Sequence, residues 1–183
     1  MEVTFKLNSL NTVIISGKVL DVRKSTDPKV KEKFMLKVSP AGYKPFALQC
    51  KLDPGSKLPA EGDKVMCVGN IRFNELKNKY TLNVSYWNQF AENIDMCIVE
   101  VMLLSRDNTV LTTVSHNVSR KSVLYHCPLR VNVSEHQLKH LENRLDLFKR
   151  YYIEGTLHSI EGLMQIDAIH IKSAETIPYT TTL

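Results

Sequence analysis

The sequence lacks the short motifs by which many enzyme active sites are recognised. Its seven glycines never form a GxGxxG cluster, and no Walker A, HExxH or GxSxG sequence occurs. Nucleotide-binding loops, zinc-peptidase helices and serine-hydrolase nucleophile turns therefore have no counterpart in the chain. We expect a binding protein without catalytic activity and without a cofactor.

Cysteine and long hydrophobic runs are also scarce. The four cysteines are far apart, without a CxxC pair, and Cys50, Cys67 and Cys97 lie in apolar, strand-like runs. Thiols in such runs behave as small hydrophobic side chains. No stretch approaches the roughly 20 apolar residues that span a bilayer, and Glu2 and Lys6 interrupt the apolar core that a secretion signal needs. We expect an intracellular protein, in the nucleus, nucleoid or cytoplasm, with reduced cysteines in its core.

One set of residues could contribute to a metal site. His136 and His140 lie one turn apart on a predicted helix, and Cys127 precedes them on a predicted strand. A closed zinc site normally needs about four ligands, and His126 points away from Cys127 because side chains alternate along a strand. We therefore expect ordinary surface histidines and no bound metal.

Positive charge is concentrated in the first half of the chain. The formal net charge is +5; residues 1–92 contain 15 lysines and arginines against 9 acidic residues, whereas residues 93–183 contain 9 against 10. A surface that binds a polyanion therefore belongs to the first half. Charge alone leaves two interpretations open, such a surface or a basic domain that is merely soluble.

The first half has the pattern of five β-strands. Apolar and β-branched residues alternate with polar ones over five stretches: 11–23, 34–39, 43–52, 64–73 and 79–90. Pro40 and Gly42 mark a hairpin turn between the second stretch and the third. The segment 53–63 contains proline and glycine repeatedly, so we predict a loop there.

The second half repeats this pattern and adds a helix. Strands are predicted over residues 94–105, 109–119, 122–133, 151–160 and 163–172. Between them, Ser134 and Gln137 have the form of a capping box, and leucines follow at helical spacing. The spacing predicts a helix over 134–150, with Lys149 and Arg150 at its C-terminus, where cations are favourable. Residues 174–183 have no pattern and are predicted to be a loose tail.

Both halves therefore share the order strand, strand, strand, connector, strand, strand. Gly69 and Gly155 lie in the fourth strand of each half, and a small barrel closes only where its long strands coil sharply, which a missing Cβ permits. We predict a mainly β protein of two consecutive five-stranded OB-type barrels. The basic domain occupies residues 1–92 and the second, OB-like domain residues 93–173. The short segment 88–95 has neither glycine nor proline, which favours close packing of the two.

Three segments carry a resemblance to a known family: NTVIISGKV at 11–19, GDKVMCVG at 62–69 and YTLNV at 80–84. Over residues 8–90 the chain resembles the OB-fold single-stranded DNA-binding proteins, which include bacterial and phage SSB and the replication protein A subunits. The resemblance implies an OB barrel that binds single-stranded DNA. Bacterial SSB recruits partners with an acidic, aromatic-tipped tail, whereas this sequence ends in ETIPYTTTL, so that role is not carried over. The second half matches the pattern weakly, and its role stays open.

The first half has both ingredients of a single-strand site, which are cations for phosphates and aromatic rings for bases. The predicted phosphate-binding residues face away from apolar neighbours on strands or lie in the loop after the first strand: Lys18, Lys24, Lys31, Lys33, Lys37, Lys44, Lys51 and Arg72. The stacking candidates lie at strand ends or beside turns: Tyr43, Phe73, Tyr86 and Trp87. An aromatic residue in a strand is more often core than ligand platform. Tyr86 and Trp87 are adjacent, so alternation places them on opposite faces.

These observations favour a sequence-tolerant single-stranded DNA-binding protein that protects or organises DNA in replication, recombination or repair. Binding to single-stranded RNA stays open because stacking and phosphate contacts do not read the 2′-hydroxyl. An alternative is a protein-interaction subunit of a nucleic-acid-processing assembly, with the second domain serving for a protein partner or for self-association. No contact with a membrane is expected.

Overall fold

A computed structural model describes residues 10–118, 124–141 and 145–174. Within these ranges the strands are β1 (Asn11–Arg23), β2 (Glu32–Val38), β3 (Phe46–Leu52), β4 (Lys64–Asn74), β5 (Lys79–Gln89), β6 (Asp95–Asp107), β7 (Val110–Val118), β8 (Leu124–Asn132), β9 (Arg150–Ile160) and β10 (Leu163–Ser173). The helical segments are the 3-10 turn η1 (Glu75–Lys77) and the helix α1 (Glu135–Leu141). None of the described helices has the length and hydrophobicity of a membrane span.

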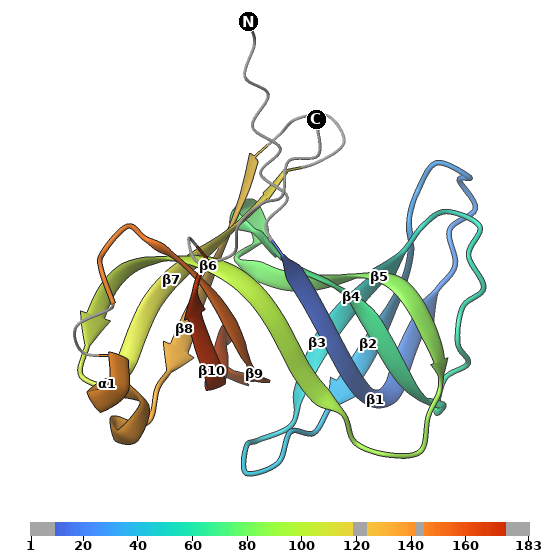
Figure 1. Ribbon diagram of the computed structural model, residues 1–183. Helices are drawn as coiled ribbons and strands as arrows, with labels where there is room; N and C mark the ends of the chain where they lie inside the picture. The colour runs from blue at the N-terminus through green and yellow to red at the C-terminus, as the bar shows by residue number, and fades with distance from the viewer. Residues whose placement is uncertain (1–9, 119–123, 142–144, 175–183) are drawn as a thin grey trace, which may run out of the picture.

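Strands β1 to β5 close into a barrel (Figure 1). β1 pairs with β2 and β4, β2 pairs with β3, and β4 pairs with β5, all antiparallel. A parallel pairing of β3 with β5 completes the ring. This circuit of five strands, with its single parallel step, is the OB-type barrel expected from the sequence.

Strands β6 to β10 repeat the same circuit of pairings. β6 pairs with β7 and β9, β7 with β8, and β9 with β10, all antiparallel. The parallel step is again between the third and fifth strands of the unit, β8 and β10. We call residues 11–89 the first unit and residues 95–173 the second unit; each is a ring of strands in which apolar side chains face inward.

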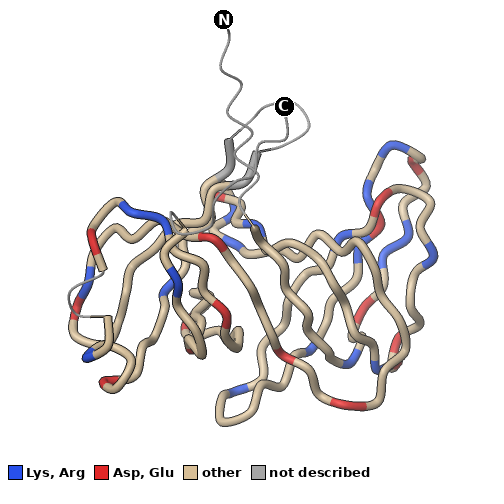
Figure 2. The backbone as a smooth tube through the Cα atoms, in the orientation of Figure 1, with Lys and Arg blue, Asp and Glu red and all other residues tan. Residues whose placement is uncertain are grey.

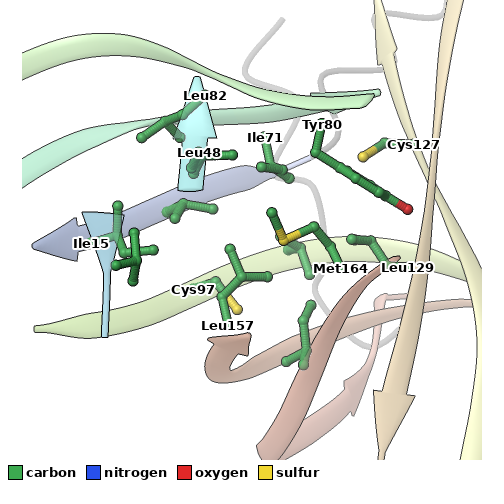
Figure 3. Close-up of a cluster of buried hydrophobic side chains, with 14 of the residues drawn as sticks. Ile15, Leu48, Ile71, Tyr80, Leu82, Cys97, Cys127, Leu129, Leu157 and Met164 are labelled. Atoms are coloured by element: carbon green, nitrogen blue, oxygen red, sulfur yellow. The ribbon is translucent and has the colours of Figure 1, made fainter. Parts of the chain in front are cut away.

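The two units share one sheet and one hydrophobic cluster. β1 pairs with β6 along the registers from Asn11 opposite Val99 to Ile15 opposite Asp95. Figure 3 shows Met164 of the second unit beside Ile71 and Tyr80 of the first. The Tyr80 hydroxyl donates a hydrogen bond of 2.6 Å to the carbonyl of Pro128 on β8. The close packing expected from the short connecting segment is therefore observed.

The strands agree with the sequence patterns except at a few ends. β3 begins at Phe46, whereas the sequence predicted a strand from residue 43; Tyr43 lies instead in the loop between β2 and β3. All four cysteines are buried and free, as expected for core residues. The predicted tail lies outside the described residues apart from Ala174, which is buried.

The predicted helix 134–150 is too long. Its start is correct: Ser134 Oγ accepts a hydrogen bond from Gln137 N at 3.2 Å, and Gln137 Oε1 accepts one from Ser134 N at 2.9 Å. The helix α1 ends at Leu141, and from residue 145 onward the described chain is not helical. The amide of Phe148 donates to Leu103 O at 2.7 Å, and Leu103 N donates to Lys149 O at 3.0 Å. Pairing with β6 therefore overrides the helical pattern of the leucines.

Two glycines allow the fourth strand of each ring to approach the fifth. A Cβ on Gly69 would lie 2.2 Å from the carbonyl oxygen of Asn83, and a Cβ on Gly155 would lie 2.2 Å from that of Asp167. In both units the register shifts beside this glycine, at a β-bulge. The bulge sharpens the local coil that closes a small barrel.

We expect Gly69→Ala and Gly155→Ala each to destabilise the protein by about 3 kcal/mol or more, because the backbone must move to admit the methyl group. The matched control is Gly62→Ala. Gly62 has φ +87°, but a Cβ there would meet nothing within 4 Å. Gly62→Ala therefore destabilises the protein only by the strain of an alanine in the left-handed region, about 1 kcal/mol. Urea unfolding of the three variants measures the difference, and equal losses would contradict the steric argument.

Candidate nucleic-acid interface

Four of the predicted basic side chains lie on the outer faces of β2, β3 and β4: Lys33, Lys37, Lys51 and Arg72. Phe34, Leu36 and Cys50 point into the barrel and are fully buried, so their neighbours Lys33 and Lys51 point outward. Lys33 lies opposite Lys51 in the register of β2 and β3. The register therefore places these two lysines side by side on the outside of the barrel. Figure 2 shows several basic positions along the first unit.

Four cations surround Lys51, and we call the five together the basic cluster: Lys31, Lys33, Lys51, Arg72 and Lys77. The pKa of Lys51 is lowered, first by partial burial of its ammonium group and then by the charges of the other four. An acidic side chain approaches the cluster, since Lys31 Nζ lies 3.5 Å from Asp53 Oδ1. The cluster is a site of positive potential that the fold creates from three strands and two loops.

Lys77 was not among the cations predicted from the sequence. It lies in η1, between β4 and β5, in the segment that separates the predicted strands 64–73 and 79–90. In OB folds the loop between the fourth and fifth strands flanks the binding face, as does the loop between the first and second. That topological rule was the signal that could have added Lys77 to the candidates.

The other predicted cations lie around the cluster or apart from it. Lys18 and Lys37 are exposed and directly opposite each other on β1 and β2. Lys37 follows Lys33 by four residues on the same face of β2, which corresponds to about 13 Å along a strand. Lys24 is exposed in the β1–β2 loop, and Lys44 is exposed in the β2–β3 loop beside Tyr43.

Tyr86 and Trp87 lie on opposite faces of β5, as predicted. Tyr86 is 53% exposed, whereas Trp87 packs against the hydrophobic cluster. Its indole Nε1 donates a hydrogen bond of 2.9 Å to the carbonyl of Lys57 in the β3–β4 loop. Trp87 thus covers one end of the barrel, and Tyr86 is the more accessible ring of this pair.

Phe73 and Tyr43 are engaged by other side chains. Phe73 packs against the hydrophobic cluster, with its ring centroid 4.8 Å from that of Tyr80. Tyr43 stacks on His158 of the second unit, with centroids 3.7 Å apart. The structure therefore brings together four of the eight predicted cations, whereas Tyr43, Phe73 and Trp87 are engaged by other parts of the protein.

A cavity of about 420 Å³ lies where the second unit faces this surface. Met35, Ala47 and Gln49 line it from β2 and β3. Ser159, Gly162 and Met164 line it from the β9–β10 hairpin. The outer face of the first unit is therefore hollowed at the boundary with the second unit.

The histidine and cysteine candidates do not form a metal site in the described part of the chain. His136 and His140 are neighbours, with Nε2 atoms 3.3 Å apart, but Cys127 is buried in the core. Among the described residues, no group of three or more His, Cys, Asp or Glu side chains is arranged to hold a metal ion.

The repulsion between Lys51 and its neighbouring cations is expected to lower the stability of the protein. We expect Lys51→Gln to raise the free energy of unfolding by about 0.5 kcal/mol at low salt, because it removes a repelled, partly desolvated charge that is exposed enough to be screened. The gain decreases at high salt. Lys139→Gln, on the exposed face of α1, is the control and leaves stability unchanged. Urea unfolding at two salt concentrations distinguishes the two; a loss of stability in Lys51→Gln contradicts the crowding.

Comparisons with known proteins agree with this architecture. No family model and no curated protein matches the chain. Among solved structures it is similar to the wild-type single-stranded DNA binding protein from Thermus aquaticus, with a TM-score of 0.62 and 14% identity over 90% of this chain and 93% of that one. A deletion mutant of the same protein gives a TM-score of 0.64 and 12% identity, over 90% of this chain and 94% of that one. A match of this extent includes strands from both units, so the chain has the OB-type fold of that protein along nearly its whole length.

Proposed function

We propose that the protein binds single-stranded nucleic acid, DNA in preference to RNA, through the basic cluster of the first unit. The observation that carries the proposal is the convergence of five cations on the outer face of β2, β3 and β4, between the β1–β2 loop and η1. These are the face and the two loops by which OB folds bind oligonucleotides. The solved structures with the same fold are those of a protein that binds single-stranded DNA.

Phosphate groups suit this cluster for an electrostatic reason. Lys51 is held among four other cations, which lower its pKa. A phosphate that enters the cluster replaces repulsion with attraction and releases the counterions condensed on the nucleic acid. Such contacts do not distinguish bases, so binding is largely independent of sequence.

Among the aromatic candidates, Tyr86 is the one best placed for an extended strand to reach. Tyr86 lies opposite Val68 on β4. Val68 precedes Arg72 on that strand by four residues, which separates the two by about 13 Å. A base stacked on an exposed ring contributes roughly 1 to 3 kcal/mol whatever its identity. We assign Tyr86 a secondary contribution, after the phosphate contacts.

A protein of this kind acts by covering transiently exposed strands. We place it inside the cell, in the nucleus, nucleoid or cytoplasm, where its four buried thiols stay reduced. Its task there is to protect or organise single strands in replication, recombination or repair. It needs no catalytic group, since binding alone performs this task.

The decisive variant removes two charges from the cluster. We expect Lys33→Gln/Lys51→Gln to weaken binding to a labelled oligodeoxythymidylate about tenfold at moderate salt, and to reduce the slope of log affinity against log salt by about 1.4. Fluorescence anisotropy over a series of salt concentrations measures both quantities. Duplex DNA of the same sequence binds more weakly than the single strand.

The control carries the same change of net charge elsewhere. Lys139→Gln/Lys172→Gln removes two exposed lysines from the second unit and is expected to bind like the wild type. Equal losses in the two double variants would show that net charge alone, and not the cluster, attracts the oligonucleotide. An absence of binding by the wild type at low salt would falsify the proposed function.

A second role, self-association, is favoured by one observation. Met96, Ile14, Val68 and Tyr86 are successive neighbours across β6, β1, β4 and β5, and they form an uncharged outer row. Met96 is 40% exposed, and Ile98 on the same face of β6 is 36% exposed. Two copies that each carry a net charge of +5 repel least where they meet through such an uncharged surface.

We expect Ile98→Lys to shift the protein from dimer to monomer in sedimentation velocity at micromolar concentration. In a twofold dimer that forms through this surface, the substitution places a lysine on each of the two facing copies. The repulsion between these like charges weakens association by several kcal/mol. Ile160→Lys, at an exposed position on β9, is the control. A wild-type protein that sediments as a monomer excludes this second role.

A further inference from the structure

Equivalent positions in the two units can be identified by aligning the glycines at their β-bulges. A Cβ added to Gly69 on β4 or to Gly155 on β9 would lie 2.2 Å from a carbonyl oxygen of the fifth strand. Three residues later, Arg72 lies opposite Thr81, and His158 lies opposite Gln165. His158 is therefore the counterpart of Arg72, on the outer face of the second unit.

The parallel strand pairs extend the match. In the first unit Lys51 lies opposite Asn83, and in the second unit Asn132 lies opposite Asp167. Asp167 follows Gln165 by two residues, as Asn83 follows Thr81. Asn132 is therefore the counterpart of Lys51, and Asp167 is the counterpart of Asn83.

The counterpart surface is not a phosphate site. An amide and a carboxylate stand where the first unit has a lysine and an amide. The pKa of Asp95 is raised to about 6, first by burial and also by the charge of Asp167, which shows that two acids share this region. A carboxylate repels phosphate but accepts hydrogen bonds from the N–H groups on base edges.

Tyr43 from the first unit covers this surface. Its ring is nearly parallel to the imidazole of His158, at 11°, with centroids 3.7 Å apart. Its hydroxyl donates a hydrogen bond of 2.5 Å to Asp167 Oδ2, and this bond is the largest cause that raises the pKa of Tyr43 to about 12. The tyrosine thus combines a stacked ring with an edge donor, as a bound nucleobase would.

His158 has the properties of a platform. It is 1% exposed, and neither ring nitrogen makes a hydrogen bond of standard geometry among the described residues, although the Gln165 side chain lies close enough to act on its pKa. Its Nδ1 lies 3.8 Å from Asp167 Oδ2, beyond hydrogen-bond distance. Burial lowers the pKa of His158, while the charge of Asp167 and the side chain of Gln165 oppose that effect, so burial favours the neutral form of the imidazole under the Tyr43 ring. A buried imidazole with unused nitrogens has unmet hydrogen-bonding capacity.

Tyr43 reaches His158 from a surface loop. Its flanking residues Ala41, Gly42 and Lys44 are exposed, and Tyr43 N donates to Pro40 O at 3.4 Å within the loop. Asp167 also accepts a hydrogen bond of 2.7 Å from Asn132 Nδ2, so the carboxylate stays oriented if the tyrosine leaves. The site beneath the loop is therefore built by the second unit itself.

We propose that Tyr43 is an internal substitute for a nucleobase: it occupies a base-binding site of the second unit formed by His158 and Asp167, and single-stranded nucleic acid displaces it. The inference rests on the proposed function, because the basic cluster must first hold the strand. In the free protein the loop is an autoinhibitory contact. In the complex a base stacks on His158 and donates an N–H to Asp167.

The test compares loop variants in binding to an oligodeoxycytidylate of about 30 nucleotides, long enough for two OB-type units. Cytosine is chosen because its exocyclic amino group donates to carboxylates. We expect Tyr43→Ala to bind at least about threefold more tightly than wild type, since no ring has to be displaced. Tyr43→Phe keeps the ring and loses the hydrogen bond to Asp167, so its affinity lies between the two.

A double-variant cycle locates the gain. His158→Ala removes the platform, and Tyr43→Ala/His158→Ala is expected to lose the gain that Tyr43→Ala shows alone. Thermal unfolding checks that each variant folds. The His158 Hε1 proton provides a second measurement by NMR: its ring-current shift from Tyr43 changes when oligodeoxycytidylate binds to the wild type.

Each outcome decides the proposal. If Tyr43 only joins the two units, folded Tyr43→Ala binds the oligonucleotide no more tightly than wild type, and the proposal is overturned. It is also overturned if the gain survives in the double variant, since the ring would then not be masking His158. Wild-type binding that depends on Lys33 and Lys51 but is unaffected by Tyr43→Ala retains the proposed function and removes this inference, whereas no binding by either protein removes both.

Discussion

The structure depends on a backbone approach that no side chain can enter. In each unit the fourth strand passes so close to the carbonyl of the fifth that only glycine fits, at Gly69 and at Gly155. That contact coils the strand pair and lets five strands close on themselves. Closure removes free sheet edges and gives each ring an inner face for the core and an outer face for binding. The position of every outward side chain follows from it.

The same ring presents different chemistry in the two units. Positions that hold Lys51, Arg72 and Asn83 in the first unit hold Asn132, His158 and Asp167 in the second. These three equivalent positions contribute part of the charge difference between the halves that is visible in the sequence. One surface suits the backbone of a polyanion, and the other suits a neutral, flat group with donors on its edge.

The sequence predicted the strands well because their information is local. Alternation along β1 or β5 records which side chains face the core, and the capping box of Ser134 and Gln137 records where α1 begins. The end of the helix was not local, because the chain from Phe148 pairs with β6 some 45 residues earlier. The spacing of leucines along the sequence carries no information about this distant pairing with β6. The OB-type circuit itself followed from the strand order and the two glycines.

The surface positions of the candidate residues could be predicted only in part, for the same reason. Outward lysines could be identified by alternation, and their convergence followed from the fold. The partners of Tyr43 could not, because His158 and Asp167 are more than 110 residues away and belong to the other unit. Treating Tyr43 as a stacking residue identified the chemistry of its ring but not the surface on which the ring lies.

An exchange of tyrosine for a base has a consequence for affinity. Both rings stack on the same imidazole, and both donate to the same carboxylate, so the stacking and hydrogen-bond energies largely cancel. The free energy of binding then comes chiefly from phosphates at the basic cluster, which do not distinguish sequence. A base that must displace Tyr43 adds little affinity but cannot be mimicked by a duplex, whose bases are already stacked and paired. Because the exchange is nearly neutral in free energy, the internal ring would leave the sequence tolerance of binding intact.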